Sequence, residues 1–150
     1  MANSFIAMHI HVVFSVKNRE RMLGADIEDD VWKYLGGICR THQIKALKIG
    51  GVEDHVHLLV GLPATISLSD FIQRLKGESS KWISSQYPGM QDFRWQDGYG
   101  AFSVGCSQID DTIAYIANQR EHHRRKTFEE EYRQFLKVHN IEVEEKYIYG

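Results

Sequence analysis

Apolar residues fall into four short runs that we expect to form strands. The runs are rich in β-branched and aromatic side chains, and they lie at residues 5–16, 43–52, 55–61 and 100–104. We expect the second run to break near Gly50 and Gly51, because glycine weakens the interior of a strand. Only Glu53 and Asp54 separate the second run from the third, which predicts a tight hairpin.

Between and after these runs, apolar residues recur every three or four positions, which predicts helices. We expect helices from about residue 26, from 68 to just before Pro88, from 109 to about 125, and from 128 onward. The last three follow a hydroxyl residue with an acidic residue three positions later, as in a capping box. These pairs are Ser67 and Asp70, Ser107 and Asp110, and Thr127 and Glu130. Residues 141–150 would be a docked strand or a loose tail.

The order of the elements is strand, helix, strand, strand, helix, strand, helix, helix. A central hairpin with helices joining the other strands is the split βαβ pattern of an α+β, ferredoxin-like (RRM-like) fold with an antiparallel sheet. We expect the helices to cover one face of the sheet and to leave the other face for a ligand or partner. Single-stranded nucleic acid is a common occupant of such a face.

Size and charge narrow the class of protein. The 150 residues suffice for one domain. No apolar run approaches the roughly 20 residues that span a bilayer, and the N-terminus does not resemble a secretory signal, so we expect a cytoplasmic protein without a membrane partner. The net charge of −2 argues against a non-specific nucleic-acid binder. The acidic excess lies late in the chain: residues 1–126 hold 15 Lys and Arg against 14 Asp and Glu, and residues 127–150 hold 3 against 6.

Candidate chemistry begins with His55 and His57 in the third strand. Because side chains alternate along a strand, the two imidazoles project from one face about 6–7 Å apart. At that distance they could bind one cation, whereas burial alone would favour Val or Leu at both positions. A second pair, His9 and His11, shares a face of the first strand and competes for this role.

Tyr115 and Gln119 lie four residues apart in the third predicted helix, so they should stack on one flank of it. A phenol has a pKa of about 10, so attack by Tyr115 on a phosphodiester would need a cation that stabilises charge on the phosphate. The attack would leave a phosphotyrosine and a 3′-hydroxyl, and it could reverse to rejoin strands. The Gln119 carbonyl would be a third ligand, in a set that suits Mg²⁺ or Mn²⁺.

These residues resemble a known family. Residues 54–59 are similar to the histidine–hydrophobe–histidine motif of HUH single-strand nucleases, and residues 115–119 resemble the tyrosine helix of single-tyrosine transposases. These enzymes are the transposase A proteins of insertion-sequence-200-like elements and the REP-associated tyrosine transposases. Further similar stretches lie at residues 11–19, 75–77 and 95–108, so the resemblance covers nearly the whole chain. The His pair alone is a weak motif, but together with Tyr-x-x-x-Gln in this order it is a strong one.

The resemblance implies a DNA transposase that cleaves and rejoins single-stranded DNA at imperfect hairpins near element ends, through a covalent 5′-phosphotyrosine. By position, the nucleophile would be Tyr115 and the metal ligands would be His55, His57 and Gln119. The resemblance also implies a homodimer in which the tyrosine helix can complete the partner's site, in the cytoplasm of a bacterial or archaeal cell and associated with the nucleoid. Residues 1–126 would form the HUH domain with its tyrosine helix, and residues 127–150 a C-terminal helix and acidic tail of the same domain.

Other side chains are candidate DNA contacts, with solvated surface as the alternative. They are Lys17, Arg19, Lys76, His122 and His123. His11 is expected to be a structural or near-site residue and not a ligand. Two further functions stay open: a metal-dependent phosphodiesterase that uses water in place of Tyr115, and a non-catalytic or domesticated hairpin-binding protein that forms no covalent adduct.

Overall fold

The computed structural model of the chain describes residues 3–144 and 148. In chain order its elements are β1 (His9–Ser15), the 3-10 turn η1 (Lys17–Arg19), α1 (Glu28–Thr41), β2 (Lys45–Val52), β3 (His55–Gly61), α2 (Leu68–Gln86), β4 (Gly100–Val104), the 3-10 turn η2 (Cys106–Gln108), α3 (Ile109–Ala117), α4 (Gln119–His123) and α5 (Phe128–Val138).

The four strands form one antiparallel sheet in the order β2-β3-β1-β4. The central strand β1 pairs with β3, where Val13 lies opposite His57, and with β4 on its other side. β2 and β3 form the predicted hairpin, in which Val52 lies opposite His55. α1 joins β1 to β2 and α2 joins β3 to β4, so the predicted ferredoxin-like α+β fold is confirmed.

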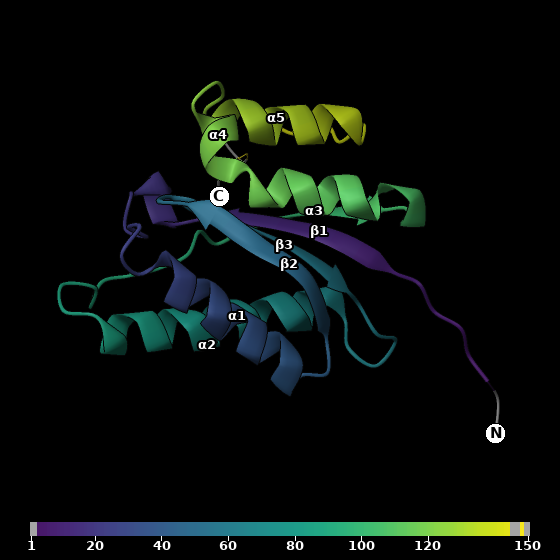
Figure 1. Ribbon diagram of the computed structural model, residues 1–150, viewed down its shortest axis with the longest axis horizontal. Helices are drawn as coiled ribbons and strands as arrows, with labels where there is room; N and C mark the ends of the chain where they lie inside the picture. Colours follow the sequence, from purple (N-terminus) through teal and green to yellow (C-terminus); the bar gives the residue numbers. More distant parts are fainter. Residues whose placement is uncertain (1–2, 145–147, 149–150) are drawn as a thin grey trace.

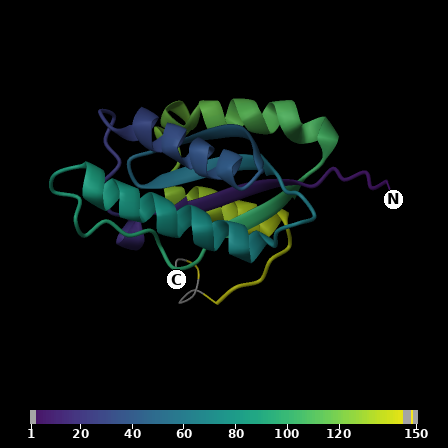
Figure 2. The same cartoon turned by 90° about the horizontal axis from the view of Figure 1, so that it is seen from below.

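α1 and α2 cover one face of the sheet (Figure 1), which is turned toward the viewer in Figure 2. Every second residue of the central strands points into this layer: Val12, Phe14, Val56, Leu58 and Val60. They pack against buried residues of the helices, including Leu35 of α1 and Leu75 of α2. Because side chains alternate along a strand, this core turns the intervening residues of β1 and β3 to the opposite face.

The opposite face is also covered, so the expectation of an open sheet face is wrong. α3 and α5 lie over it (Figure 1). Val13 of β1 and Phe102 of β4 pack against Phe128 and Tyr132 of α5, and together with Ile148 they form a second core. This face carries apolar strand residues that must be removed from water, and the last helices supply the cover.

β2 continues through Gly50 and Gly51, so the predicted break at these glycines is wrong. The irregularity in the strand lies earlier, where the register with β3 shifts between Ala46 and Lys48. The glycine at position 50 serves a different purpose. A Cβ atom there would lie 2.9 Å from the carbonyl oxygen of Ile116, so the absence of a side chain lets α3 lie directly on the sheet.

The helix predicted from residue 109 to about 125 is two helices. Asn118 separates α3 from α4, with φ −103° and ψ 28°. α4 is then held in its own direction by Arg120, whose guanidinium pairs with Glu28 of α1 and with Glu53 of the β2–β3 hairpin, both at 2.7 Å.

Two of the three predicted capping boxes are confirmed. The hydroxyls of Ser67 and Thr127 accept the backbone N–H groups of the acidic residues three positions later and cap α2 and α5. Ser107 does not cap α3. It lies within η2, and the residue before α3 is Gln108, whose side chain makes no capping bond.

The ends of the chain differ in part from the prediction. β1 begins at His9 and not at residue 5, and Phe5 is 95% exposed on a segment that leads away from the sheet (Figure 1). Of the predicted tail, residues 145–147 and 149–150 lie outside the described residues, and residues 141–144 form neither helix nor strand. Within the described part of the chain, no helix has the length and apolar character needed to cross a membrane.

Candidate metal and tyrosine site

His55 and His57 project from the same face of β3, as strand alternation predicts. Both are fully buried, and their ring centroids lie 5.1 Å apart. Burial lowers the pKa of His57 to about 4, although the nearby carboxylate of Glu131 opposes this shift. The His57 ring is therefore neutral near pH 7, which is the form of imidazole that binds a cation.

A further side chain orients each of the two imidazoles. Nδ1–H of His55 donates to the Asp54 carboxylate at 2.7 Å, which leaves Nε2 for a ligand and is a common arrangement behind metal-binding histidines. Nδ1 of His57 lies 2.8 Å from Nε2 of His11 on β1. His11 thus lies beside the site, while His9 lies opposite Gly61 at the other end of β3.

Gln119 begins α4 and is 1% exposed. Its Nε2 donates to the carbonyl of Tyr115 at 3.1 Å, so its Oε1 faces Nε2 of His55 at 3.3 Å. The prediction that Tyr115 and Gln119 stack on one continuous helix is wrong, because Asn118 separates α3 from α4. Gln119 instead reaches His55 from the first position of α4.

Tyr115 reaches the same place from α3. Its ring centroid lies 5.7 Å from that of His57. Its hydroxyl donates to the carboxylate of Glu131 and lies 3.1 Å from Nε2 of His122. Burial and the charge of Glu131 raise the pKa of Tyr115 above its ordinary value, so the phenol is protonated in this arrangement. The structure therefore brings the predicted imidazoles, amide and phenol together within one chain.

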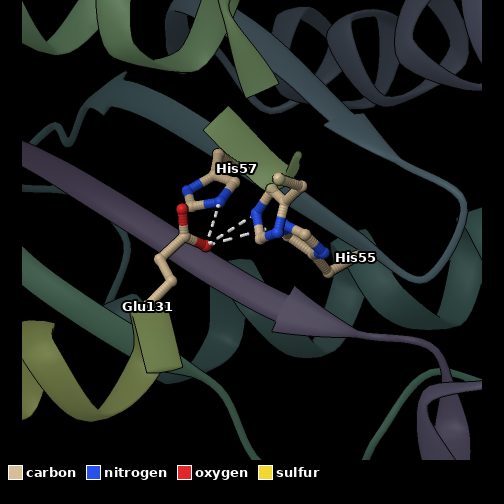
Figure 3. Close-up of side chains that lie close together, drawn as sticks. His55, His57 and Glu131 are labelled. Atoms are coloured by element: carbon tan, nitrogen blue, oxygen red, sulfur yellow. Dashed lines mark hydrogen bonds and ion pairs between the residues drawn. The ribbon is translucent and has the colours of Figure 1, made fainter. Parts of the chain in front are cut away.

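A carboxylate that the sequence analysis did not single out lies at the centre of this group. Glu131 points from α5 toward the two imidazoles of β3 (Figure 3) and is 2% exposed. Its Oε1 lies 3.0 Å from Nε2 of His57 and 3.6 Å from Nε2 of His55. Burial alone would raise the pKa of Glu131, but the surrounding imidazoles hold it well below its usual range, so the carboxyl is ionised.

The pattern of α5 contains a signal that could have identified Glu131. Phe128, Tyr132 and Phe135 mark its apolar face at helical spacing, and Glu131 falls on that same face. A carboxylate there is buried and therefore needs partners. The signal was hidden because three successive glutamates at residues 129–131 look like the exposed acidic first turn of a helix.

His122 and His123, which were predicted as DNA contacts, also turn toward Glu131. Nε2 of His122 lies 3.5 Å from Oε2, and Nε2 of His123 lies 3.4 Å from Oε1. Nε2 of His123 is buried and makes no hydrogen bond to the described residues. Its contact with Glu131 is therefore an ion pair without a well-formed hydrogen bond, which leaves this buried nitrogen able to take a further partner.

The residues fit a divalent cation. The ligand atoms of His55, His57, His123 and Glu131 all lie within 4.8 Å of one another, and the amide oxygen of Gln119 lies beside them. Around an ion with bonds of about 2.1 Å, neighbouring ligand atoms lie about 3.0–3.4 Å apart. The closest contacts in the cluster, 3.0 to 3.6 Å, lie within these separations or slightly above them. Carboxylate and amide oxygens are ligands that suit Mg²⁺ and Mn²⁺, and imidazole nitrogens are ligands of transition metals.

The remaining predicted DNA contacts are engaged within the protein. Lys17 pairs with Asp97 at 3.3 Å and Arg19 with Glu129 at 3.1 Å. Both pairs are exposed, so they are weak and could be exchanged for phosphate. Nζ of Lys76 donates to three successive backbone carbonyls before β4, at 2.5 to 3.3 Å, and burial lowers its pKa to about 8. Lys76 therefore holds this loop together.

A cavity of about 360 Å³ between α3 and α5 reaches the tyrosine. His11, Tyr115, His122, Lys126 and Glu131 are among the residues that line it. The phenol is therefore positioned between the buried imidazole cluster and a space that a ligand could enter.

The sequence matches a family of DNA-mobilising enzymes. Residues 4–119 match the family described as "Transposase IS200 like". The chain is 30% identical over 118 residues to the transposase for insertion sequence element IS200 of Salmonella typhimurium, across 74% of this chain and 76% of that protein. α5 and Glu131 lie beyond the residues that match the family.

Two solved structures share the fold. One is a Deinococcus radiodurans R1 protein proposed to be a transposase, with a TM-score of 0.62 and 22% identity, covering 79% of this chain and 96% of that one. The other is a REP-associated tyrosine transposase bound to a REP hairpin, with a TM-score of 0.61 and 13% identity, covering 82% of this chain and 73% of that one.

Proposed function

Because the chain belongs to the family of IS200-like transposases, we propose that it cleaves and rejoins single-stranded DNA through a covalent bond between Tyr115 and a 5′-phosphate. One observation carries this proposal. The phenol of Tyr115, the buried imidazole pair of β3 and the amide of Gln119 meet inside a single chain, although they come from three separate elements.

In this proposal His55, His57 and Gln119 hold a Mg²⁺ or Mn²⁺ ion. When bound, the ion polarises the phosphate and stabilises the charge that develops on its oxygens. Asp54 holds the imidazole of His55 in position at its Nδ1, and His11 does the same at Nδ1 of His57. The protein thus presents a positioned phenol next to a site for phosphate.

The chemical step exchanges one phosphodiester for another. Oη of Tyr115 forms a bond to phosphorus while the bond from phosphorus to the 3′-oxygen breaks, and that oxygen takes up a proton to become a 3′-hydroxyl. For this step the phenol hydroxyl, which donates to Glu131 in the structure, turns to Nε2 of His122, 3.1 Å away. His122 takes the proton because the ionised Glu131 is the weaker base, and it returns the proton, directly or through water, to the leaving 3′-oxygen. Attack by a 3′-hydroxyl on the phosphotyrosine reverses the step and joins two strands.

The DNA partner we propose is a single strand that carries imperfect hairpins near element ends. A structural neighbour is bound to a REP hairpin, which supports this choice. Lys17 and Arg19 would contact the DNA backbone once their exposed ion pairs are released. A homodimer is part of the proposal, and residues 127–150 would belong to the same domain as residues 1–126, because α5 packs on the sheet.

The proposal is tested with the purified protein, Mn²⁺ and an oligonucleotide that carries a hairpin and a flanking cleavage site. We expect a protein–DNA adduct that survives denaturant. Tyr115→Phe should abolish the adduct and leave binding largely intact, because only the attacking oxygen is removed. His57→Ala should also prevent cleavage.

Two other functions give different results in this assay. A phosphodiesterase that uses water would cleave the oligonucleotide without an adduct, and its Tyr115→Phe variant would retain turnover. A hairpin-binding protein would retain DNA but neither cleave it nor form an adduct. An adduct that persists in Tyr115→Phe would mean that another residue is the nucleophile.

A further inference from the structure

The family match ends at residue 119, but the cluster of ligand atoms continues beyond it. We propose that His123 of α4 and Glu131 of α5 are additional ligands of the divalent cation, so that the C-terminal elements complete the metal site. The inference rests on the proposed function, since it places the cation at the imidazole pair of β3.

The position of Glu131 is the first argument. Its Oε1 faces three imidazole Nε2 atoms at 3.0, 3.4 and 3.6 Å, from His57, His123 and His55 in that order. These distances are close to the separations of ligands that share an ion. The contacts of Glu131 with His55 and His57 join β3 to α5, two elements that are separated by more than 60 residues in the chain. The fold therefore directs a carboxylate oxygen to the place where the histidine nitrogens converge (Figure 3).

Charge is the second argument. The Glu131 carboxylate is buried, and its ion-pair partners among the described residues are all imidazoles, with no lysine or arginine. A buried carboxylate is costly unless a full opposite charge faces it, and an imidazole supplies one only when it is protonated. A divalent cation between Oε1 and the imidazoles would supply that charge.

His123 faces the same point from α4. Its Nε2 is buried, makes no hydrogen bond to the described residues and lies 3.4 Å from Oε1 of Glu131. Its ring centroid is 4.5 Å from that of His55, so it borders the same point from another side. With three imidazoles, one amide and one carboxylate, the site should bind Mn²⁺ more tightly than Mg²⁺.

The experiment measures Mn²⁺ binding to the full-length protein without DNA, by calorimetry and by the electron paramagnetic resonance signal of free Mn²⁺. We expect Glu131→Gln and His123→Gln each to weaken Mn²⁺ binding by about tenfold or more. Glu131→Asp keeps the charge but withdraws the carboxylate by one methylene, so it should also weaken binding. Mg²⁺ should compete only at much higher concentration.

Matched controls separate ligation from general charge and from folding. Glu130→Gln removes the same charge from the neighbouring, exposed position of α5. His42→Gln removes the imidazole at the C-terminal end of α1, which pairs with Glu78 of α2. Both should bind Mn²⁺ as the unaltered protein does. Circular dichroism and the unfolding temperature check that each variant is folded.

The outcomes distinguish this inference from the proposed function. If His57→Ala loses Mn²⁺ while Glu131→Gln and His123→Gln keep it, the inference is wrong and the three-ligand site of the proposed function stands. Tighter Mn²⁺ binding by Glu131→Gln would also overturn it, because the carboxylate would then compete with the ion for the imidazoles. If the unaltered protein binds no Mn²⁺, both the inference and the metal dependence of the proposed function fail.

Discussion

His11 shows how a residue beside the site affects the stability of the protein. It is buried on β1, and its Nε2 lies within hydrogen-bond distance of Nδ1 of His57, at 2.8 Å. Burial, with a contribution from the neighbouring His57, lowers the pKa of His11 from 6.5 to about 3. The folded protein therefore keeps this ring neutral at pH values where the unfolded chain binds a proton there.

This difference predicts a loss of stability in mild acid. Below pH 6.5 the unfolded state binds a proton that the folded state does not bind, so the free energy of unfolding falls with pH until the folded ring titrates near pH 3. By pH 5 the loss from this ring is about 2 kcal/mol. In His11→Gln, which keeps a polar group next to His57, the loss should be smaller by about this amount. Urea unfolding from pH 7 to about 5, with chelator present, measures the difference.

The lowered pKa of Glu131 does not interfere with this measurement. Because the pKa of Glu131 is lower in the folded protein than in the unfolded chain, acid also reduces stability through this carboxyl. That loss arises only below about pH 4.5, where the unfolded carboxyl begins to bind a proton. An unchanged pH dependence in His11→Gln would show that the His11 ring is charged in the folded protein.

At the scale of elements, the contact between α3 and β2 places the tyrosine. Ile116 is buried against the sheet, and its carbonyl oxygen would lie 2.9 Å from a Cβ atom on Gly50. Tyr115 precedes Ile116, so any outward movement of α3 at this contact also moves the phenol. The position of the nucleophile thus depends on the absence of a side chain on the neighbouring strand.

Gly50→Ala should therefore harm both stability and activity. The added Cβ would lie 2.9 Å from a backbone oxygen that cannot rotate away, so α3 must shift. We expect a loss of about 1–3 kcal/mol in the free energy of unfolding and a lower yield of DNA adduct. Gly77→Ala is the matched control, because a Cβ at this exposed position of α2 meets nothing within 4 Å. It should raise stability by about 0.5–1 kcal/mol and leave the adduct yield unchanged. Equal adduct yields in the two variants would contradict this role of Gly50.

The same scale shows what the sequence could and could not predict. The His pair, the hairpin and the caps at Ser67 and Thr127 follow from local rules of alternation, turn length and hydrogen bonding, and the structure has them. The break at Asn118 was missed because residues 109–125 carry a helical pattern throughout. Its causes are distant in sequence: the buried position of Gln119 and the ion pairs of Arg120 with two other elements.

Glu131 was missed for a related reason. Its spacing places it on the apolar face of α5, but only the docking of that helix over β1 and β3 shows which partners it meets. The open sheet face was wrongly expected because the sequence pattern gives the apolar faces of helices but not the layer that each helix covers.

At the scale of the whole molecule, Tyr115 lies beside His57 of the same chain, with their ring centroids 5.7 Å apart. To serve a partner's site, Tyr115 would have to leave the cavity between α3 and α5, and α3 would have to leave its contact with Gly50. The ion pairs of Arg120 with Glu28 and Glu53 also hold the adjoining helix in place. We therefore expect the site to work within one chain, even in a homodimer.

A mixing experiment tests this expectation. Tyr115→Phe and His57→Ala are each expected to be inactive. If each site forms within one chain, co-expression of the two variants should not restore activity. If tyrosines instead act across a dimer, the His57→Ala chain would supply its phenol to the imidazoles of the other chain and would itself carry the DNA. A size tag on one variant shows which chain is labelled, and an adduct on the His57→Ala chain would overturn the expectation.

The helices over both faces of the sheet limit what shape of DNA can enter. The cavity between α3 and α5 that reaches Tyr115 has a volume of about 360 Å³, close to the lower end for small-molecule pockets. This volume accommodates a short unpaired segment of backbone with its bases but not two paired strands. DNA that reaches the phenol in this arrangement would therefore have to be unpaired before any base is recognised, and a hairpin would have to remain outside while its flank passes in.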